Sequence, residues 1–181
     1  MARLFFAIFL FALISLCFEA YASDFSNRYI AAAKPRHIAS FTFRDDQGRI
    51  LDLNDFKGSY VLLNLWATWC GPCVREMAGL DMLQQKIDGK KLRILALTED
   101  HEGVSAALSF YKRHDLHHLP VLADAAGEAP SILHINGLPT TLLIDPNGME
   151  VGRIEGDADW DDDDTLAFLN KQMKRSLAQS K

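Results

Sequence analysis

The sequence predicts a three-layer α/β domain, in which a mixed, twisted β-sheet carries helices on both faces. Three features of the 181-residue chain lead to this prediction. Short apolar runs of strand length alternate with segments of helical periodicity. The apolar run 61–66 passes directly into a helical pattern, which is typical of a buried strand followed by a helix. Farther on, 141–144 and 150–154 flank the turn sequence Asp145-Pro146-Asn147-Gly148, so part of the sheet is expected to be an antiparallel hairpin.

Residues 1–22 have the composition of a secretion signal peptide. Met1-Ala2-Arg3 gives a positive start, residues 4–18 are almost wholly apolar, and Ala20-Tyr21-Ala22 has the small-x-small pattern of a cleavage site. We therefore expect Ser23 to begin the mature chain, and we expect that chain in the periplasm. The apolar run is short for a membrane span, which needs about 20 residues, but an uncleaved inner-membrane anchor remains the alternative.

Cleavage would leave Cys70 and Cys73 as the cysteines of the mature chain, since Cys17 lies in the leader. A secreted chain with one such pair is not a scaffold held together by disulfides. The net charge is −5 and the sequence has no block of Lys or Arg, which argues against a nucleic-acid partner. We expect a monomer with one domain.

Residues 23–39 lack clear periodicity and are interrupted by Pro35, so we predict a linker or a loosely docked arm. The domain itself is expected at 40–175, followed by a polar tail at 176–181. It should open with a β-hairpin, because 41–43 and 49–53 alternate across a polar turn.

The stretch VLLNLWATWCGPCVREMAGL at 61–80 places two thiols where a strand passes into a helix. Pro72 suits the first helical turn, which has no partner for an N–H group. Unpaired N–H groups and the positive end of the helix dipole favour a thiolate, and lower the pKa of such a cysteine from its ordinary value of about 8.5. Cys70 is therefore the expected nucleophile. Cys73 would attack a mixed disulfide formed on Cys70.

Two polar residues accompany these cysteines. Asn64 interrupts the apolar strand, and we interpret it as a core amide whose hydrogen bonds are satisfied. Glu76 follows Cys73 by one helical turn. Buried beside a thiol, Glu76 would have a raised pKa and could accept the thiol proton. The alternative is a solvated carboxylate that complements the helix dipole.

The remaining elements alternate between strand and helix. The sequence predicts strands at 92–97 and 119–122, and helices at 104–114, 131–135 and 166–173. Four histidines suggest a metal site: His101, His114, His117 and His118. The last three lie where the helix predicted at 104–114 ends, and polar side chains are ordinary at a helix C-terminus. The acidic run 161–164 could suggest calcium, but it directly precedes a helix, where N-capping explains it.

The segment WATWCGPC with its long helix, the continuation VREM and the later GLPTTLLIDPNG resemble the thioredoxin superfamily, and specifically its TlpA/ResA branch of extracytoplasmic thiol-disulfide oxidoreductases. The resemblance covers roughly residues 39–174 and implies a thioredoxin-like fold with a helix-strand insertion at 104–122. It implies a redox-active Cys70–Cys73 disulfide that needs no cofactor or metal, with Glu76 as a catalytic partner. It further implies a cis peptide before Pro139 and a substrate groove flanked by Trp69, Leu138, Pro139 and Thr140.

The Gly-Pro dipeptide between the cysteines resembles the reducing members of that branch. The resemblance implies a reductase that receives electrons from a membrane thiol transporter. It keeps client cysteines reduced, either in apocytochrome c or in a copper-delivery protein and its oxidase target. The segment 152–160, GRIEGDADW, is closer to TlpA and favours copper-site maturation. The alternative is a copper metallochaperone that uses Cys70, Cys73 and a histidine, although copper carriers on this fold usually space their cysteines one residue wider.

Overall fold

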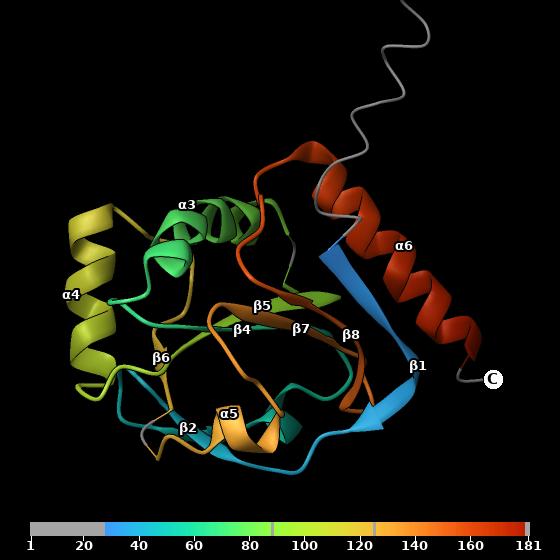
Figure 1. Ribbon diagram of the computed structural model, residues 1–181, viewed down its shortest axis with the longest axis horizontal. Coiled ribbons are helices and arrows are strands. Elements are labelled where there is room, and N and C mark those ends of the chain that lie inside the picture. The colour runs from blue at the N-terminus through green and yellow to red at the C-terminus, as the bar shows by residue number, and fades with distance from the viewer. Residues whose placement is uncertain (1–27, 88, 125, 180–181) are drawn as a thin grey trace, which may run out of the picture.

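The computed structural model describes residues 28–179 apart from 88 and 125 (Figure 1). The predicted leader, its cleavage site and Cys17 lie outside the described residues. Among those residues, no helix combines the length and apolarity that a membrane crossing requires.

The described residues form one eight-stranded mixed sheet with the strand order β1-β8-β7-β4-β5-β6-β2-β3. Helices α3 and α6 lie on one face and the short α5 lies on the other, so the predicted three layers are confirmed (Figure 1). The elements are β1 Tyr29–His37, β2 Thr42–Asp45, β3 Ile50–Asp52, the 3-10 helix η1 Leu53–Phe56, β4 Tyr60–Trp66, α3 Gly71–Lys86, β5 Leu92–Thr98, α4 Val104–His114, β6 Leu122–Ala123, α5 Ala129–Ile132, β7 Thr140–Ile144, β8 Met149–Glu155 and α6 Asp163–Gln179.

Strand β4 is the centre of the sheet, and all seven of its residues are buried. It pairs in parallel with β5 and antiparallel with β7, so Leu63 lies between Leu95 and Leu142. Because side chains alternate along a strand, Leu62 and Trp66 face α3, whereas Leu63 and Leu65 face the core beneath α5. The carboxyl end of β4 leads directly to Cys70.

The N-terminal segment, predicted to be a linker or a loosely docked arm, forms a strand over 29–37. Its residues Tyr29–His37 form the edge strand β1, which pairs antiparallel with β8 from Tyr29↔Ile154 to His37↔Met149. Tyr29 lies over Gly152, where an added Cβ would overlap the tyrosine ring, and its hydroxyl donates to the Val151 carbonyl at 3.2 Å. None of the β1 residues is buried, so the sequence has no apolar alternation that would reveal this strand.

Two later elements are displaced from their expected positions. The strand predicted at 119–122 is β6 at Leu122–Ala123, since the Leu119 N–H donates to the Asp81 carboxylate instead of to a neighbouring strand. The helix predicted at 131–135 is α5 at Ala129–Ile132, which has Pro130 in its first turn. The hairpins β2–β3 and β7–β8 and the helix α4 are present as predicted.

The start of α6 uses its acidic run as the sequence suggests. The Asp162 carboxylate accepts the Asp164 N–H at 3.0 Å, and the Asp162 carbonyl accepts the Thr165 N–H at 3.0 Å. These bonds satisfy N–H groups that a helix N-terminus leaves without intrahelical partners.

Candidate active site

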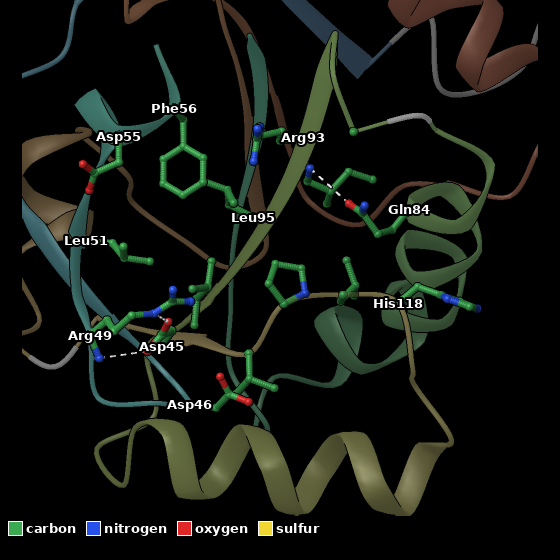
Figure 2. Close-up of a pocket in the computed structure, with 16 residues that line it drawn as sticks. Asp45, Asp46, Arg49, Leu51, Asp55, Phe56, Gln84, Arg93, Leu95 and His118 are labelled. Carbon is green, nitrogen blue, oxygen red and sulfur yellow. Dashed lines mark hydrogen bonds and ion pairs between the residues drawn. The ribbon is translucent and has the colours of Figure 1, made fainter. Parts of the chain in front are cut away.

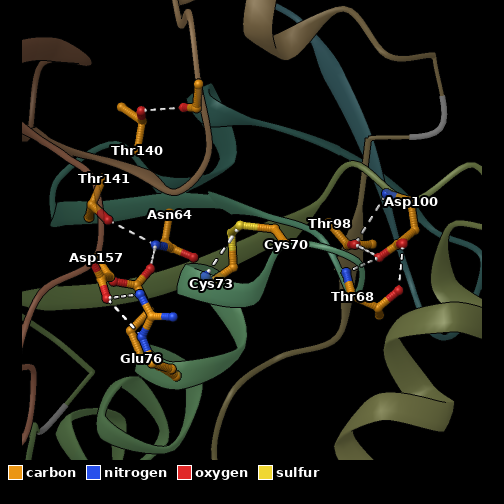
Figure 3. The surroundings of a disulfide bond; sticks show 12 residues. Asn64, Thr68, Cys70, Cys73, Glu76, Thr98, Asp100, Thr140, Thr141 and Asp157 are labelled. Carbon is orange, nitrogen blue, oxygen red and sulfur yellow. Dashed lines mark hydrogen bonds and ion pairs between the residues drawn. A yellow bond between two sulfur atoms is a disulfide. The ribbon is translucent and has the colours of Figure 1, made fainter.

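The two cysteines are joined as a Cys70–Cys73 disulfide at the start of α3, with an S–S distance of 2.05 Å (Figure 3). Cys70 is the N-cap of the helix, and its Sγ accepts the Cys73 N–H at 3.2 Å. Cys70 retains 6% exposure and Cys73 none, so an attacking molecule reaches Cys70 first. The helix N-terminus directs N–H groups and a positive dipole end at this sulfur, which favours a thiolate there once the disulfide is reduced.

The loop between β4 and Cys70 is fastened by Asp100, a residue that the sequence did not single out. The buried Asp100 carboxylate accepts the Thr68 N–H at 2.9 Å, the Thr68 hydroxyl at 2.7 Å and the Thr98 hydroxyl at 2.6 Å (Figure 3). These bonds hold the backbone two residues before Cys70. The sequence could have indicated this contact, because Asp100 closely follows the strand predicted at 92–97. The carboxyl ends of parallel strands meet at the same edge of a sheet, which brings Asp100 near the end of β4.

Glu76 is buried, with 4% exposure, and lies one turn beyond Cys73. Its Oε1 accepts the Asn64 Nδ2–H at 2.7 Å, while its Oε2 accepts the Ala158 N–H at 3.0 Å and the Trp160 Nε1–H at 2.9 Å. Burial raises the pKa of this carboxyl to about 7, although the three hydrogen bonds oppose the change. The alternative of a solvated carboxylate is therefore wrong.

The loop that meets Glu76 approaches α3 closely because residue 79 is glycine. A Cβ on Gly79 would lie 3.3 Å from the Trp160 Cβ and 3.3 Å from the Asp161 nitrogen. Beside this contact is a surface pocket of about 310 Å³ that Glu76 lines together with Arg75 and Asp157. The Arg75 guanidinium pairs with the Asp157 carboxylate at 2.8 Å. The carboxyl group thus has a polar route to the surface.

Of the predicted substrate-groove residues, Trp69, Leu138 and Pro139 lie at the cysteine loop, and Thr140 does not. Trp69 is 71% exposed, and Leu138 is half-buried against the core that contains both cysteines. The Leu138–Pro139 peptide is cis, as expected. Because Leu65 pairs with Thr140, the register of β4 and β7 brings Leu138 and Pro139 beside the end of β4, next to the cysteine loop.

Thr140 is placed differently from the expectation that it flanks the groove. It is 2% exposed, and its hydroxyl donates to the Gly137 carbonyl at 2.7 Å. Thr140 therefore closes the turn that carries Leu138 and Pro139, and it does not line the surface.

The histidines around the end of α4 have structural contacts. The His114 ring stacks on Phe110 with a centroid separation of 4.1 Å. The His117 ring lies 2.8 Å from the Asp115 carboxylate, and the backbone N–H groups of His117 and His118 donate to Asp81. In the part of the chain that the structure describes, no three His, Cys, Asp or Glu side chains are grouped to hold a metal ion.

A pocket of about 600 Å³ lies between the β2–β3 hairpin, the first half of β5 and the segment 118–122 that leads into β6 (Figure 2). Its lining contains neither cysteine nor Glu76. Its polar side chains make structural contacts: Arg49 pairs with Asp45 at 2.6 Å, and Gln84 accepts the Ile94 N–H at 3.2 Å. We therefore place the candidate active site at the disulfide.

Residues 35–149 match the AhpC/TSA family. ResA, a thiol-disulfide oxidoreductase of Bacillus thuringiensis subsp. konkukian (strain 97-27), is 37% identical over 122 residues, which cover 67% of this chain and 69% of the relative. ResA of Geobacillus thermodenitrificans (strain NG80-2) is 33% identical over 141 residues, covering 78% and 79% of the two chains.

Solved structures agree with these relatives. A protein assigned as the thiol:disulfide interchange protein DsbE of Chlorobium tepidum has a TM-score of 0.65 and 26% identity, covering 81% of this chain and 99% of that chain. Etrx1, described as an exposed lipoprotein thioredoxin of Streptococcus pneumoniae strain TIGR4, has a TM-score of 0.58 and 28% identity, covering 74% and 99%. With its thioredoxin-like sheet and its disulfide at the start of α3, this chain belongs to the AhpC/TSA family and is a thiol-disulfide oxidoreductase of the ResA type.

Proposed function

We propose that this chain is a periplasmic reductase that keeps the cysteines of client proteins reduced. The single observation that carries the mechanism is the buried Glu76 carboxyl, one helical turn from the fully buried Cys73. A group with a pKa of about 7 exchanges protons readily near neutral pH, which suits a general base for an inner thiol.

The reaction begins with Cys70 as a thiolate and Cys73 as a thiol. The Cys70 sulfur attacks a client disulfide, whose S–S bond breaks and releases one client thiolate. Cys73 then gives its proton to the Glu76 carboxylate and attacks the Cys70 sulfur of the mixed disulfide. The Cys70–Cys73 bond forms and the second client thiolate leaves. Two electrons have passed to the client without a further cofactor.

Client docking is proposed on the surface around Cys70. The exposed Trp69 indole offers a large apolar face on one side, and Leu138 with the buried Pro139 supplies an edge on the other. An extended peptide can pair with backbone at such an edge while its cysteine faces Cys70. Thr140 acts here as a support, because its hydroxyl holds the Gly137 carbonyl.

The surroundings of the reaction are also part of the proposal. The signal-like leader of the sequence supports export, with an inner-membrane anchor as the alternative. In an oxidising compartment the disulfide has to be reduced again, and a membrane thiol transporter is the proposed donor. Apocytochrome c, or a copper-delivery protein and its oxidase target, are the proposed clients. A copper metallochaperone is less well supported, because His114 and His117 are engaged away from the cysteines.

A trapping experiment tests this function. Cys73→Ser should still attack client disulfides through Cys70 but should accumulate mixed disulfides, which mass spectrometry of the captured proteins would identify. Cys70→Ser, the matched control, should capture none. Undiminished turnover by Cys73→Ser would contradict the resolving role. Equilibration of the parent with glutathione then measures the reduction potential of the Cys70–Cys73 pair, which decides the direction of electron transfer. A reductase should have a potential well below that of thioredoxin-like oxidants, which lie near −120 mV.

A further inference from the structure

Asn64 occupies a place in the active site that the mechanism above leaves unused. It is fully buried on β4. Its side chain lies on the face shared by Leu62 and Trp66, which belong to the same core as Cys73. Figure 3 shows the Asn64 amide between Glu76 and Cys73, with its nitrogen toward Glu76 and its oxygen on the side of Cys73.

The two ends of this amide are used unequally. Nδ2 donates to the Glu76 Oε1 at 2.7 Å and to the Thr141 hydroxyl at 2.8 Å, so both of its hydrogens are engaged. Oδ1 is buried and has no hydrogen-bond partner within the described part of the chain. The sequence-based interpretation of Asn64 as a satisfied core amide is therefore correct for the nitrogen and wrong for the oxygen. A buried acceptor without a donor destabilises the state in which it occurs.

The redox state of Cys73 explains why the Asn64 Oδ1 has no hydrogen-bond donor here. In the Cys70–Cys73 disulfide the Cys73 sulfur carries no hydrogen, so it has nothing to donate. Reduction gives Cys73 an S–H group on the fully buried side of the pair. We propose that Asn64 Oδ1 accepts the S–H of reduced Cys73, and that Asn64 is thereby a residue that selectively stabilises the reduced form and positions the inner thiol beside Glu76.

The same amide also fits the state that follows proton transfer. When the Cys73 proton has passed to Glu76, the sulfur is a thiolate that needs a donor and the carboxyl is an acid that needs an acceptor. A half-turn of the Asn64 amide supplies both, since Nδ2 then faces the sulfur while Oδ1 faces Glu76 and the Thr141 hydroxyl. A threonine hydroxyl can donate as well as accept, so Thr141 serves either orientation. An aspartate at position 64 could not offer this exchange.

A comparison of two variants separates this role from simple core packing. Asn64→Leu removes the amide while retaining a side chain of similar size, and Thr141→Val removes the hydroxyl partner of Nδ2 while leaving Oδ1 in place. The equilibrium constant of the Cys70–Cys73 pair with glutathione is measured below pH 7, which is below the ordinary thiol pKa of about 8.5. Asn64→Leu should shift the constant about tenfold toward the disulfide, which corresponds to about 30 mV. Thr141→Val should change it less than about twofold. Equal shifts in both variants, or none in either, would overturn the proposal.

A spectroscopic measurement needs no change at Asn64. The mature chain with Cys70→Ser has one thiol, so its infrared S–H stretching band reports Cys73 alone. A hydrogen bond to Oδ1 should displace this band to lower frequency, and adding Asn64→Leu should return it to the frequency of a free thiol. A band at the free frequency with Asn64 intact would refute the pairing, even if Asn64→Leu fails to fold.

This inference rests on the proposed assignment of Cys73 as the inner, resolving thiol. The two can fail separately. If the parent does not reduce client disulfides but the S–H band is displaced, the proposed function fails and the Asn64–Cys73 pairing stands. If the parent reduces its clients and the band is not displaced, the proposed function stands and the Asn64–Cys73 pairing fails.

Discussion

The Trp160 indole donates its Nε1–H to the Glu76 carboxylate across 2.9 Å, although 84 positions separate the two residues in the chain. This bond places a loop that precedes α6 directly over the proposed base. It stabilises the ionised carboxylate, whereas burial favours the neutral acid and dominates the pKa. The pKa of Glu76 is thus set in part by a residue far outside the cysteine motif.

Removal of that donor should move the titration of Glu76. In Trp160→Phe the carboxylate loses a hydrogen bond to its charged form, so its pKa should rise above about 7 by about one unit. Infrared spectroscopy of the carboxyl group would follow the titration, with Glu76→Gln identifying the band. A midpoint that stays in place or falls would show that the indole does not stabilise the ionised form.

The pH dependence of stability should carry the signature of the same group. The pKa of Glu76 is raised to about 7 in the fold from an ordinary value of 4.5, so between these values the folded chain holds a proton that the unfolded chain has lost. Its contribution to the free energy of unfolding is therefore greatest below pH 4.5 and falls as pH rises to about 7, in total by about 3 kcal/mol.

Denaturant unfolding of the oxidised chain at several pH values measures this decline. The difference between the parent and Glu76→Gln isolates Glu76, because other titrating groups such as Glu99, whose pKa burial raises to about 8, are present in both. A parent-minus-variant difference that is constant from pH 4.5 to 7 would contradict a buried, titrating Glu76.

Docking of β1 should depend on Gly152. An added Cβ would overlap Tyr29 and lie 2.9 Å from the Ile30 carbonyl, so Gly152→Ala should displace the first residues of β1 and destabilise the fold by about 1–3 kcal/mol. Hydrogen exchange at Tyr29 and Ala31 would report the loss of pairing. Gly137→Ala is the control, because a Cβ there meets no atom within 4 Å. Unchanged protection in Gly152→Ala would refute the close contact.

The extent to which the sequence predicts this site follows from how local each contact is. The strand, the turn and the helix around Cys70 and Cys73 are encoded by neighbouring residues, so their arrangement could be predicted. The Glu76 position one turn from Cys73 is equally local. Its burial is not, because Ala158 and Trp160 cover it from a remote loop.

The pairing of β1 and the contact of Asp100 with the cysteine loop could not be predicted from sequence patterns, because both join segments that are distant in the chain. Strand β1 is held by pairing with β8 from the other end of the chain and by Tyr29 over Gly152, and its exposed side chains give no apolar period. Asp100 reaches Thr68 only because β5 lies beside β4 in parallel, a relationship that the two segments do not encode separately.

The copper alternative makes a separate prediction. A variant in which His101, His114, His117, His118 and His134 are replaced by glutamine should reduce a protein disulfide, without added metal, at the rate of the parent. Its Cu(I) affinity should also equal that of the parent, with Cys73→Ala as the control that removes a thiol ligand. Tight Cu(I) binding that depends on one of these histidines would favour the metallochaperone.

The most direct test of the proposed mechanism is the pH profile of the resolving step in the parent and in Glu76→Gln. Mixing the reduced chain with an aromatic disulfide reagent releases one aromatic thiol when Cys70 attacks and a second when Cys73 resolves the mixed disulfide, so stopped-flow absorbance separates the two steps. In the parent, the rate of the second release should rise with pH around a midpoint near 7, as Glu76 becomes able to accept the proton. In Glu76→Gln that rise should disappear and the rate should fall by about 10²–10⁴-fold, while the first release is little changed. Equal rates and equal profiles for the second release would contradict the role of Glu76 as the base.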